Sequence, residues 1–343
     1  MNFALDKNMP KHYNIPIFIP ELACPFRCVF CNQRKISGHI TIPSPDDILK
    51  IVNNHLATFT HESRNVDIAF FGGNFTGIPL QEQEQYLRLV EPFVLSQQVQ
   101  GIRISTRPDY INDEVLELLR RFHVTTIELG AQSFDDEVLH KSFRGHSALQ
   151  TEKASRLILE NGFHLGLQMM IGLPGDSLQA ALHTASRIVA LGATSTRIYP
   201  TVVIKQTALH QWYNEGKYQP LSLEEAIRWT AYLLPVFETA NIDILRVGLH
   251  PSEGLVLGKE LIAGPFHPQF RELVLSHIWR NQLEKATESL EVSRLEIHIA
   301  PGQMNYAVGH KKSNKLWLDS RYRIRFVEDK QLAGREFRIE AVR

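Results

Sequence analysis

Short apolar runs alternate along the chain with longer stretches in which apolar residues recur at helical spacing. The apolar runs are rich in β-branched and aromatic residues, which is typical of strands, and they cover 15–21, 66–71, 101–106, 125–131, 164–171, 194–199 and 242–247. The amphipathic stretches between them include 81–96, 113–122, 149–161, 178–190 and 223–240. This alternation predicts an α/β fold with a parallel sheet and helical crossovers. Six or more such units in about 240 residues favour a full or partial TIM-type (β/α) barrel, with a doubly wound open sheet as the alternative.

The pattern changes after residue 250. One long helix is expected at 272–288, followed by short strands at 293–300, 322–328 and 336–342. We therefore predict two domains, a barrel over 1–250 and a small α+β domain over 251–343. The tail also differs in charge, because residues 294–343 hold 11 Lys and Arg against 6 Asp and Glu.

The bulk composition is that of an ordinary globular protein. Apolar residues make up 43% of the 343 residues, and 37 Lys and Arg balance 37 Asp and Glu, so the net charge gives no argument for nucleic acid. Residues 1–14 contain no apolar segment of a secretory signal, and no apolar run approaches the roughly 18 residues that span a bilayer. We expect a cytoplasmic protein that does not act on a membrane.

The three cysteines, Cys24, Cys28 and Cys31, all lie within eight residues, with the spacing C-x3-C-x2-C after the first predicted strand. Three thiolates hold three irons of a 4Fe-4S cluster and leave the fourth open, which is the mark of a catalytic metal site. The alternatives are a structural zinc site completed by His39 and plain reactive thiols. Zinc sites more often use paired C-x2-C units, and a structural disulfide has no distant partner here.

Further polar and glycine-rich segments follow the later strands. Paired glycines let a backbone approach a ligand closely, and an arginine can clamp a carboxylate with two hydrogen bonds. Polar side chains on a buried strand need partners, so a structural hydrogen-bond network is the plainer explanation for some of them. The segments are Gly72-Gly73-Asn74, Ser105-Thr106-Arg107-Pro108-Asp109, Glu128 to Phe134, Arg144-Gly145-His146 and Gln168 to Gly175.

The cysteine spacing after a first strand resembles the radical S-adenosylmethionine superfamily. The resemblance implies that the open iron binds the amino and carboxylate groups of S-adenosylmethionine. One electron from the cluster then cleaves the sulfonium to a 5′-deoxyadenosyl radical, which abstracts hydrogen from a substrate. The electron implies a reductant protein of the flavodoxin or ferredoxin type as a partner.

The later segments, in their order over 15–245, are similar to the radical half of the elongator catalytic subunit family, which modifies the wobble uridine of tRNA. A more distant resemblance links the Gln-Ser-Phe and Gly-Leu-Pro-Gly pieces to anaerobic coproporphyrinogen oxidases. These resemblances imply a cofactor site in which Phe30 lies on the adenine and Arg144 holds the carboxylate. Gly72, Gly73 and Asn74 would contact the amino group, Gln132 and Gln168 would lie near the ribose, and Thr106 would complete the set. No residue is assignable as the hydrogen-donating or quenching group.

This sequence also departs from the elongator pattern. Asn74 stands where relatives carry Glu or Thr, Ser105 stands where the elongator family has Glu, and 246–251 replaces that family's usual sequence. No acetyltransferase module is expected in the tail, and three cysteines are too few for the auxiliary cluster of tRNA methylthiolation. We expect hydrogen abstraction from an unidentified substrate, in tRNA modification or on a porphyrin or other small molecule. A non-catalytic iron–sulfur or zinc module is the alternative.

Basic and aromatic residues interleave in the tail. Arg321, Arg323 and Arg325 alternate, so one strand is expected to present them on a single face. Basic side chains follow a phosphate backbone, and exposed aromatic rings stack on unpaired bases. The alternative is a solvated strand face over a small apolar core.

Overall fold

The computed structural model describes residues 11–19, 28–32, 42–59, 64–250 and 258–342. Its contacts divide the chain into two compact units, Pro10–Phe266 and a second unit that contains His267–Arg343. The division expected at residue 250 precedes β9 (Leu261–Ala263), which pairs antiparallel with β7 (Val203–Ile204) inside the larger unit. Each unit is described by itself.

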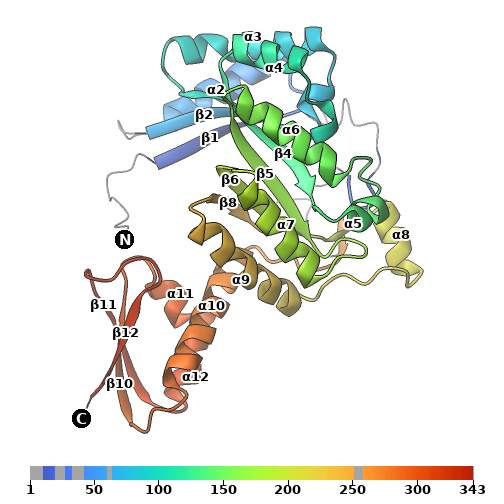
Figure 1. Cartoon of the computed structure of the whole chain (residues 1–343). Coiled ribbons are helices and arrows are strands. Elements are labelled where there is room, and N and C mark those ends of the chain that lie inside the picture. Colours follow the sequence, from blue (N-terminus) through green and yellow to red (C-terminus); the bar gives the residue numbers. More distant parts are fainter. Residues whose placement is uncertain (1–10, 20–27, 33–41, 60–63, 251–257, 343) are drawn as a thin grey trace. The chain divides into compact units, whose positions relative to one another are not determined.

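The larger unit is built on one curved sheet of seven strands (Figure 1). All neighbouring strands are parallel, and they lie side by side in chain order: β1 (Lys11–Phe18), β2 (Arg64–Phe71), β3 (Gly101–Thr106), β4 (Val124–Gln132), β5 (His164–Ile171), β6 (Ser195–Pro200) and β8 (Asp243–Val247). A doubly wound sheet reverses its strand order, so that alternative is wrong. β1 and β8 are the two edge strands and, within the described residues, do not pair with each other, so the barrel is partial.

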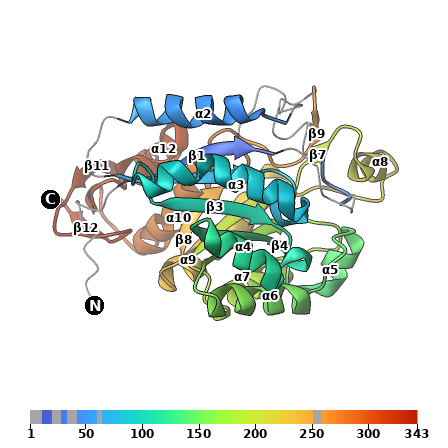
Figure 2. The same ribbon diagram turned by 90° about the horizontal axis from the view of Figure 1, so that it is seen from above.

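Helices connect the strands and cover the outer face of the sheet (Figure 2). They are α2 (Pro45–Thr58), α3 (Leu80–Leu95), α4 (Asp113–Arg121), α6 (Ala148–Glu160), α7 (Leu178–Ala190) and α9 (Leu223–Thr239). Two shorter helices, α5 (Asp136–Lys141) and α8 (Ala208–Asn214), instead contribute Val138 and Leu209 to an apolar cluster with Val29 and Phe30. Short 3-10 turns, η1 (Phe75–Gly77) and η2 (Pro108–Tyr110), follow β2 and β3. Capping boxes start α6 at Ser147 and α9 at Ser222, so each of these helices begins at a defined residue.

The two faces of the sheet differ because side chains alternate along each strand. The outer face carries fully buried apolar residues such as Ile68, Ile104 and Ile127 under the helices. The inner face carries buried polar and charged residues, among them Arg103 and Glu128. The inner face is therefore the side of the sheet with chemical capacity.

The smaller unit is α+β, as predicted. It contains α10 (Phe270–Thr287), β10 (Arg294–Ile299), α11 (Met304–Val308), η3 (His310–Lys312), α12 (Ser313–Asp319), β11 (Arg323–Glu328) and β12 (Phe337–Ala341). β10 is the central strand, parallel to β11 and antiparallel to β12. Its core gathers around Trp279, Leu283, Leu295, Ile297 and Leu318.

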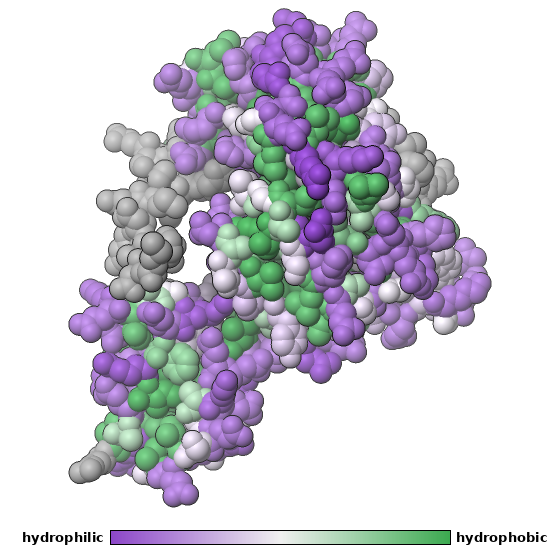
Figure 3. Space-filling view, viewed as in Figure 1, coloured by the Kyte–Doolittle hydropathy of each residue, from purple (hydrophilic) through white to green (hydrophobic). Residues whose placement is uncertain are grey.

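The face of the described chain that Figure 3 shows is mainly polar. In the space-filling view, hydrophilic residues cover most exposed helix sides, with hydrophobic residues in bands between them (Figure 3). Among the residues that the structure describes, no helix has the length and apolar character needed to cross a bilayer.

Candidate functional site

The residues singled out by sequence follow the carboxyl ends of neighbouring strands. A parallel sheet in chain order places these ends at one edge, where barrel enzymes carry their sites. Gly72 to Asn74 follow β2, Thr106 ends β3, Gln132 ends β4 and Gln168 lies in β5. Of the cysteines, Cys28 and Cys31 are described, whereas Cys24 and the alternative zinc ligand His39 lie outside the described residues.

The end of the cysteine loop is held by the segment that follows α5. Arg144 Nη1 donates to Cys28 Sγ at 3.3 Å, and Arg144 Nη2 donates to the Gly130 carbonyl at 2.5 Å. The Val29 amide donates to the Ser142 carbonyl at 3.2 Å. The guanidinium of the arginine expected to hold a carboxylate thus lies directly beside a sulfur of the cysteine motif.

Phe30 packs in the apolar cluster beneath this loop. The cluster also contains Val29, Val138, Leu173 and Tyr218. Phe30 is only 9% exposed. The structure therefore shows a packing role for this ring, and its contact with adenine stays a prediction.

The paired glycines after β2 make a turn that other residues do not readily adopt. Gly72 has φ +90° and Gly73 has φ +56°, and a Cβ on Gly72 lies 3.0 Å from the Ile19 carbonyl oxygen. Backbone conformations with positive φ favour glycine, and the close approach leaves no room for a side chain. Because glycine has no side chain, a ligand at this end of the sheet would meet the backbone of the turn.

Asn74 and Thr106 fix that turn to the end of β3. The Thr106 hydroxyl donates to Asn74 Oδ1 at 2.6 Å, and the Arg107 amide donates to the same oxygen at 3.2 Å. Thr76 Oγ1 lies 2.5 Å from the Thr106 hydroxyl. The carbonyl of Asn74, one of the groups considered for the cofactor, is therefore bonded within the protein.

Gln132 is held in a strained position by a bulge in β4. The pairing of β4 with β5 shifts between Leu129 and Gln132, and Gln132 has φ +66°. Its amide oxygen is buried and has no hydrogen-bond partner among the described residues, and the same is true of Arg144 Nε. Strained backbone and buried polar atoms without partners gather at ligand sites.

Gly130 lies between these groups. A Cβ built on Gly130 would be 2.8 Å from Gln132 Nε2, 3.4 Å from Arg144 Nη2 and 3.7 Å from the Thr106 carbonyl oxygen. The structure thus brings Gln132, Arg144 and Thr106 together around Gly130, and Arg144 links this group to Cys28.

The inner face carries a buried charge network around Glu128, whose partners Arg103, Arg197 and Asp67 were not identified by the sequence analysis. Glu128 accepts from Arg197 Nε at 2.6 Å, from Arg197 Nη2 at 3.1 Å and from Arg103 Nη1 at 2.9 Å. Asp67 lies 3.7 Å from Arg103, and Gln168 Nε2 donates to Glu128 at 3.4 Å. Burial raises the pKa of Glu128, but Arg197 and Arg103 outweigh it and hold that pKa below its usual range. Strand alternation in 101–106 and 194–199 was the available signal, because it places both arginines on the inner face.

The Arg-Gly-His segment is fixed by the Thr-Arg-Pro-Asp segment. Arg107 forms two hydrogen bonds to Asp109, at 2.9 and 3.0 Å, and donates to the Arg144 carbonyl at 2.6 Å. Burial, Arg144 and Arg107 together lower the pKa of His146 to about 3, so this ring is neutral at pH 7. The Thr-Arg-Pro-Asp segment therefore positions Arg144 through its backbone carbonyl.

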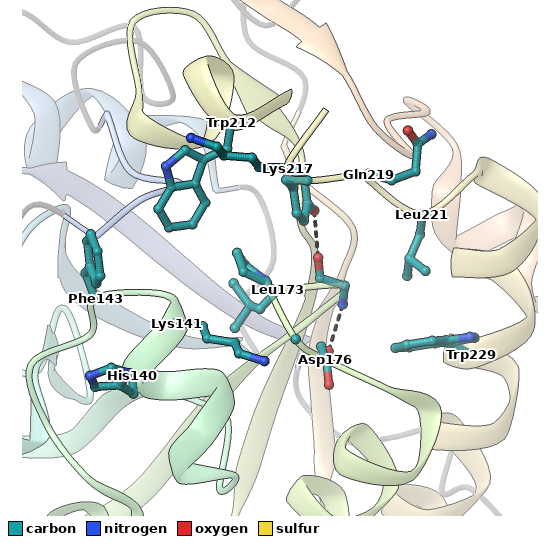
Figure 4. Close-up of a pocket in the computed structure, with 14 residues that line it drawn as sticks. His140, Lys141, Phe143, Leu173, Asp176, Trp212, Lys217, Gln219, Leu221 and Trp229 are labelled. Carbon is teal, nitrogen blue, oxygen red and sulfur yellow. Dashed lines mark hydrogen bonds between the residues drawn. The ribbon is translucent and has the colours of Figure 1, made fainter. Parts of the chain in front are cut away.

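A separate pocket of about 640 Å³ adjoins the Gly-Leu-Pro-Gly turn (Figure 4). Trp212, Trp229 and Phe143 line it, and none of the charged network on the inner face does so. Tyr218 donates to the Gly172 carbonyl at 2.7 Å, and Asp176 accepts from the Gly172 amide at 2.8 Å. Burial raises the pKa of Asp176 to about 6. These bonds fix the turn after β5.

The residues present fit the expected cofactors. The partnerless atoms Gln132 Oε1 and Arg144 Nε supply an acceptor and a donor beside Cys28, which suits a ligand that carries amino, carboxylate and hydroxyl groups. Among the described residues, no group of three or more His, Cys, Asp or Glu side chains is placed to hold a second metal.

Comparison with known proteins finds two family models that match the chain. The model of the Radical SAM superfamily matches residues 19–188, and that of the Radical_SAM C-terminal domain matches 193–280. A tRNA uridine(34) acetyltransferase of Dehalococcoides mccartyi is 25% identical over 240 residues, covering 60% of this chain and 52% of the relative. Uncharacterized protein MJ0486 of Methanocaldococcus jannaschii is 30% identical over 231 residues, covering 63% of this chain and 69% of the relative.

A solved structure shares the fold. The Elp3 of Methanocaldococcus infernus, with an N-terminal deletion, has a TM-score of 0.62 and 18% identity, covering 80% of this chain and 64% of that one. The chain thus spans about half the length of the acetyltransferase and just under two thirds of this Elp3. The cysteine motif, the partial barrel and both family models agree: the chain belongs to the radical SAM superfamily and is an enzyme whose cofactors are a 4Fe-4S cluster and S-adenosylmethionine.

Proposed function

We propose that the enzyme modifies tRNA, abstracting hydrogen at a site built around Arg144 and Gln132. One observation carries the proposal of the site. The Arg144 guanidinium contacts Cys28 Sγ, and the side-chain oxygen of the adjacent Gln132 has no partner among the described residues. The names of the tRNA uridine(34) acetyltransferases among the relatives support a tRNA substrate.

Each side chain has a proposed share in holding the cofactors. Cys24, Cys28 and Cys31 ligate the cluster, and Arg144 pairs with the carboxylate of S-adenosylmethionine. The backbone of Gly72 and Gly73 receives the amino group, because the Asn74 carbonyl oxygen is occupied by Thr106 and Arg107. Gln132 and Gln168 lie near the ribose, and Phe30 lies near the adenine.

The bound cofactors supply reductive cleavage of the sulfonium, which yields an oxidising carbon radical. The chain supplies position and shelter. Arg107 and Asp109 hold the Arg144 backbone, and the Gly130 carbonyl holds its guanidinium. Cys28, Gln132 and Arg144 are all buried, which keeps water away from a reactive centre.

The test of the chemistry is anaerobic cleavage of S-adenosylmethionine. Protein reconstituted with iron and sulfide should give 5′-deoxyadenosine and methionine with dithionite, or with a one-electron carrier of flavodoxin or ferredoxin type. Cys28→Ala should lose both the cluster absorbance and the products, whereas Arg323→Ala, in the smaller unit, should retain both. A loaded cluster that yields no product with any reductant contradicts the proposal, as does one zinc per chain without iron.

The test of the substrate follows hydrogen from its source. Unmodified tRNA carrying deuterated uridine should transfer deuterium into 5′-deoxyadenosine, and unlabelled tRNA in the same buffer should not. Deuterium arriving only from a labelled porphyrinogen or another small molecule rules out tRNA as the hydrogen source.

A further inference from the structure

Arg246 lies at the edge of the partial barrel, on its inner face. Its strand, β8, is the last in the sheet, and Arg246 is the Cα partner of Arg197 on β6. Neighbouring residues in parallel register share a face. Arg246 therefore extends the row of charged side chains that begins at Asp67 and passes through Glu128.

The charges in this row do not balance. Asp67 and Glu128 lie within ion-pair distance of Arg103 and Arg197, which together account for both carboxylates. Arg246 is the third guanidinium, and within the described part of the chain no carboxylate lies within 4.0 Å of it. The edge of the inner face thus has an unneutralised positive charge.

The contacts of Arg246 are local. Its Nε donates to the Gly248 carbonyl at 3.3 Å, and its Nη2 donates to His250 Nδ1 at 3.0 Å. Both partners lie within four residues, so the hydrogen bonds of Arg246 to described residues link no separate elements of the fold. Two bonds leave the guanidinium with free N–H groups, because it has five.

The surroundings make the charge unfavourable unless an anion accompanies it. Burial and the nearby Arg197 lower the pKa of Arg246, although Tyr199 opposes this. Burial and Arg246 lower the pKa of His250, so its ring accepts the bond from Arg246 as a neutral group. A half-buried arginine that has N–H groups to spare, and no carboxylate partner among the described residues, can offer its fork to an oxyanion.

We infer that Arg246, oriented by His250, binds an oxyanion of the substrate at the open edge of the barrel. A guanidinium fork recognises two oxygens on one centre, which a phosphate or a carboxylate supplies. A backbone phosphate of RNA is the oxyanion that follows if the inference is joined to the proposed function. The segment 246–251 is also where this sequence departs from the elongator pattern, so the site is a property of this chain.

The inference is tested by equilibrium binding, which does not depend on turnover. Anaerobic holoenzyme is titrated with uridine 5′-monophosphate, with uridine and with the tetracarboxylate coproporphyrin III. The native protein should bind the nucleotide more tightly than the nucleoside. Arg246→Gln should weaken nucleotide binding by about tenfold to a hundredfold, the usual effect of losing a charged hydrogen-bond donor.

Two further variants make the result specific. Arg228→Gln, an exposed arginine on α9, should bind like the native protein. Arg246→Lys keeps the charge without the fork and should bind with intermediate affinity. The inference is overturned if native protein and Arg246→Gln bind the nucleotide equally and also bind the porphyrin equally. It is also overturned if the native protein binds neither probe.

The outcomes also separate this inference from the proposed function. If Arg246→Gln weakens only porphyrin binding, the oxyanion site stands and the tRNA substrate does not. If the variant binds every probe like the native protein but deuterium still passes from tRNA, the proposed function stands and the oxyanion site does not.

Discussion

Glu128 is a buried carboxylate shared by two arginines from β3 and β6. Its side chain is 1% exposed, and it forms hydrogen bonds to both guanidinium groups. Neither arginine could be assigned to it from sequence, because Arg103 and Arg197 lie 25 and 69 residues away along the chain. Alternation predicts the face of a side chain, whereas pairing across strands depends on register.

Glu128→Gln should destabilise the larger unit severely. Removal of the negative charge leaves two buried guanidinium groups with too few partners, and breaking a buried ion pair in this way costs about 3–5 kcal/mol. Denaturant unfolding measures the change in the free energy of unfolding. Glu137→Gln removes an exposed carboxylate, 2.6 Å from Lys141, and should change it little. Similar losses for the two variants contradict this account of the network.

Asp176 should give stability an unusual pH dependence. Burial raises its folded pKa to about 6 from 3.8, so the folded state binds this proton more tightly than the unfolded state. Its contribution to stability is therefore present below pH 3.8 and falls as pH rises to about 6, by about 3 kcal/mol in total.

The measurement is the free energy of unfolding at several pH values, for native protein and Asp176→Asn. His146, with a folded pKa of about 3, acts in the opposite direction, since its neutral form stabilises the fold above pH 6.5. The difference between the two proteins removes that background. The variant should gain stability relative to native as pH rises from 4 to 6, and parallel profiles are evidence against a raised Asp176 pKa.

At the scale of elements, the β/α rhythm predicted the strands that form the sheet. β-branched and aromatic runs bounded by turns identified β2 to β6 and β8 closely. β1 begins at Lys11, earlier than the expected strand at 15–21, because its first residues are polar and only their pairing with β2 makes them a strand. α2 was absent from the predicted helices, although Ser44 and Asp47 form a capping box that marks its start.

The bulge at the end of β4 could not be predicted. Regular strand alternation places Glu128, Gly130 and Gln132 on one face, whereas the structure shifts the register before Gln132. Backbone at positive φ is favoured for no ordinary residue, so no local preference in the sequence indicates it. The bulge gives Gln132 its place beside Arg144.

Gln132→Gly should therefore separate stability from function. Glycine adopts φ +66° without the penalty of a side chain, so the variant should be more stable by about 1 kcal/mol. It also removes the partnerless amide, so S-adenosylmethionine should bind more weakly. Thermal unfolding and equilibrium binding of S-adenosylmethionine measure the two effects. Gln97 also has a positive φ but is exposed, so it provides the control. Gln97→Gly should gain stability and leave the binding of S-adenosylmethionine unchanged. A Gln132→Gly protein that binds S-adenosylmethionine like native removes this residue from the cofactor site.

At the scale of the whole molecule, charge is segregated along the sequence. The neutral total hides a tail with 11 Lys and Arg against 6 Asp and Glu over 294–343. The structure corrects one detail of the predicted strand face, because β11 begins at Arg323 and leaves Arg321 before it. Arg323 and Arg325 share the exposed face of β11, whereas Arg321 and Arg280 lie over Trp317, at 5.2 and 3.5 Å from the ring centroid.

Arg323 and Arg325 should contribute to the binding of unmodified tRNA. β11 is an edge strand of its sheet, and the Arg325 side chain is 78% exposed, with Glu296, 3.4 Å away, as its one carboxylate neighbour in the part of the chain that the structure describes. Exposed arginines at this spacing can each neutralise a phosphate, and removing one such arginine lowers the dependence of affinity on salt by about one unit of slope.

Filter binding across a salt series should give a smaller slope, by about two units, for the double Arg323/Arg325→Ala variant. The double Lys153/Arg156→Ala variant removes two exposed basic residues from α6 in the other unit and should keep the native slope. Identical slopes for all three proteins would mean that β11 presents an ordinary solvated face, and the phosphate-binding side chains of any tRNA complex would then have to lie elsewhere in the chain.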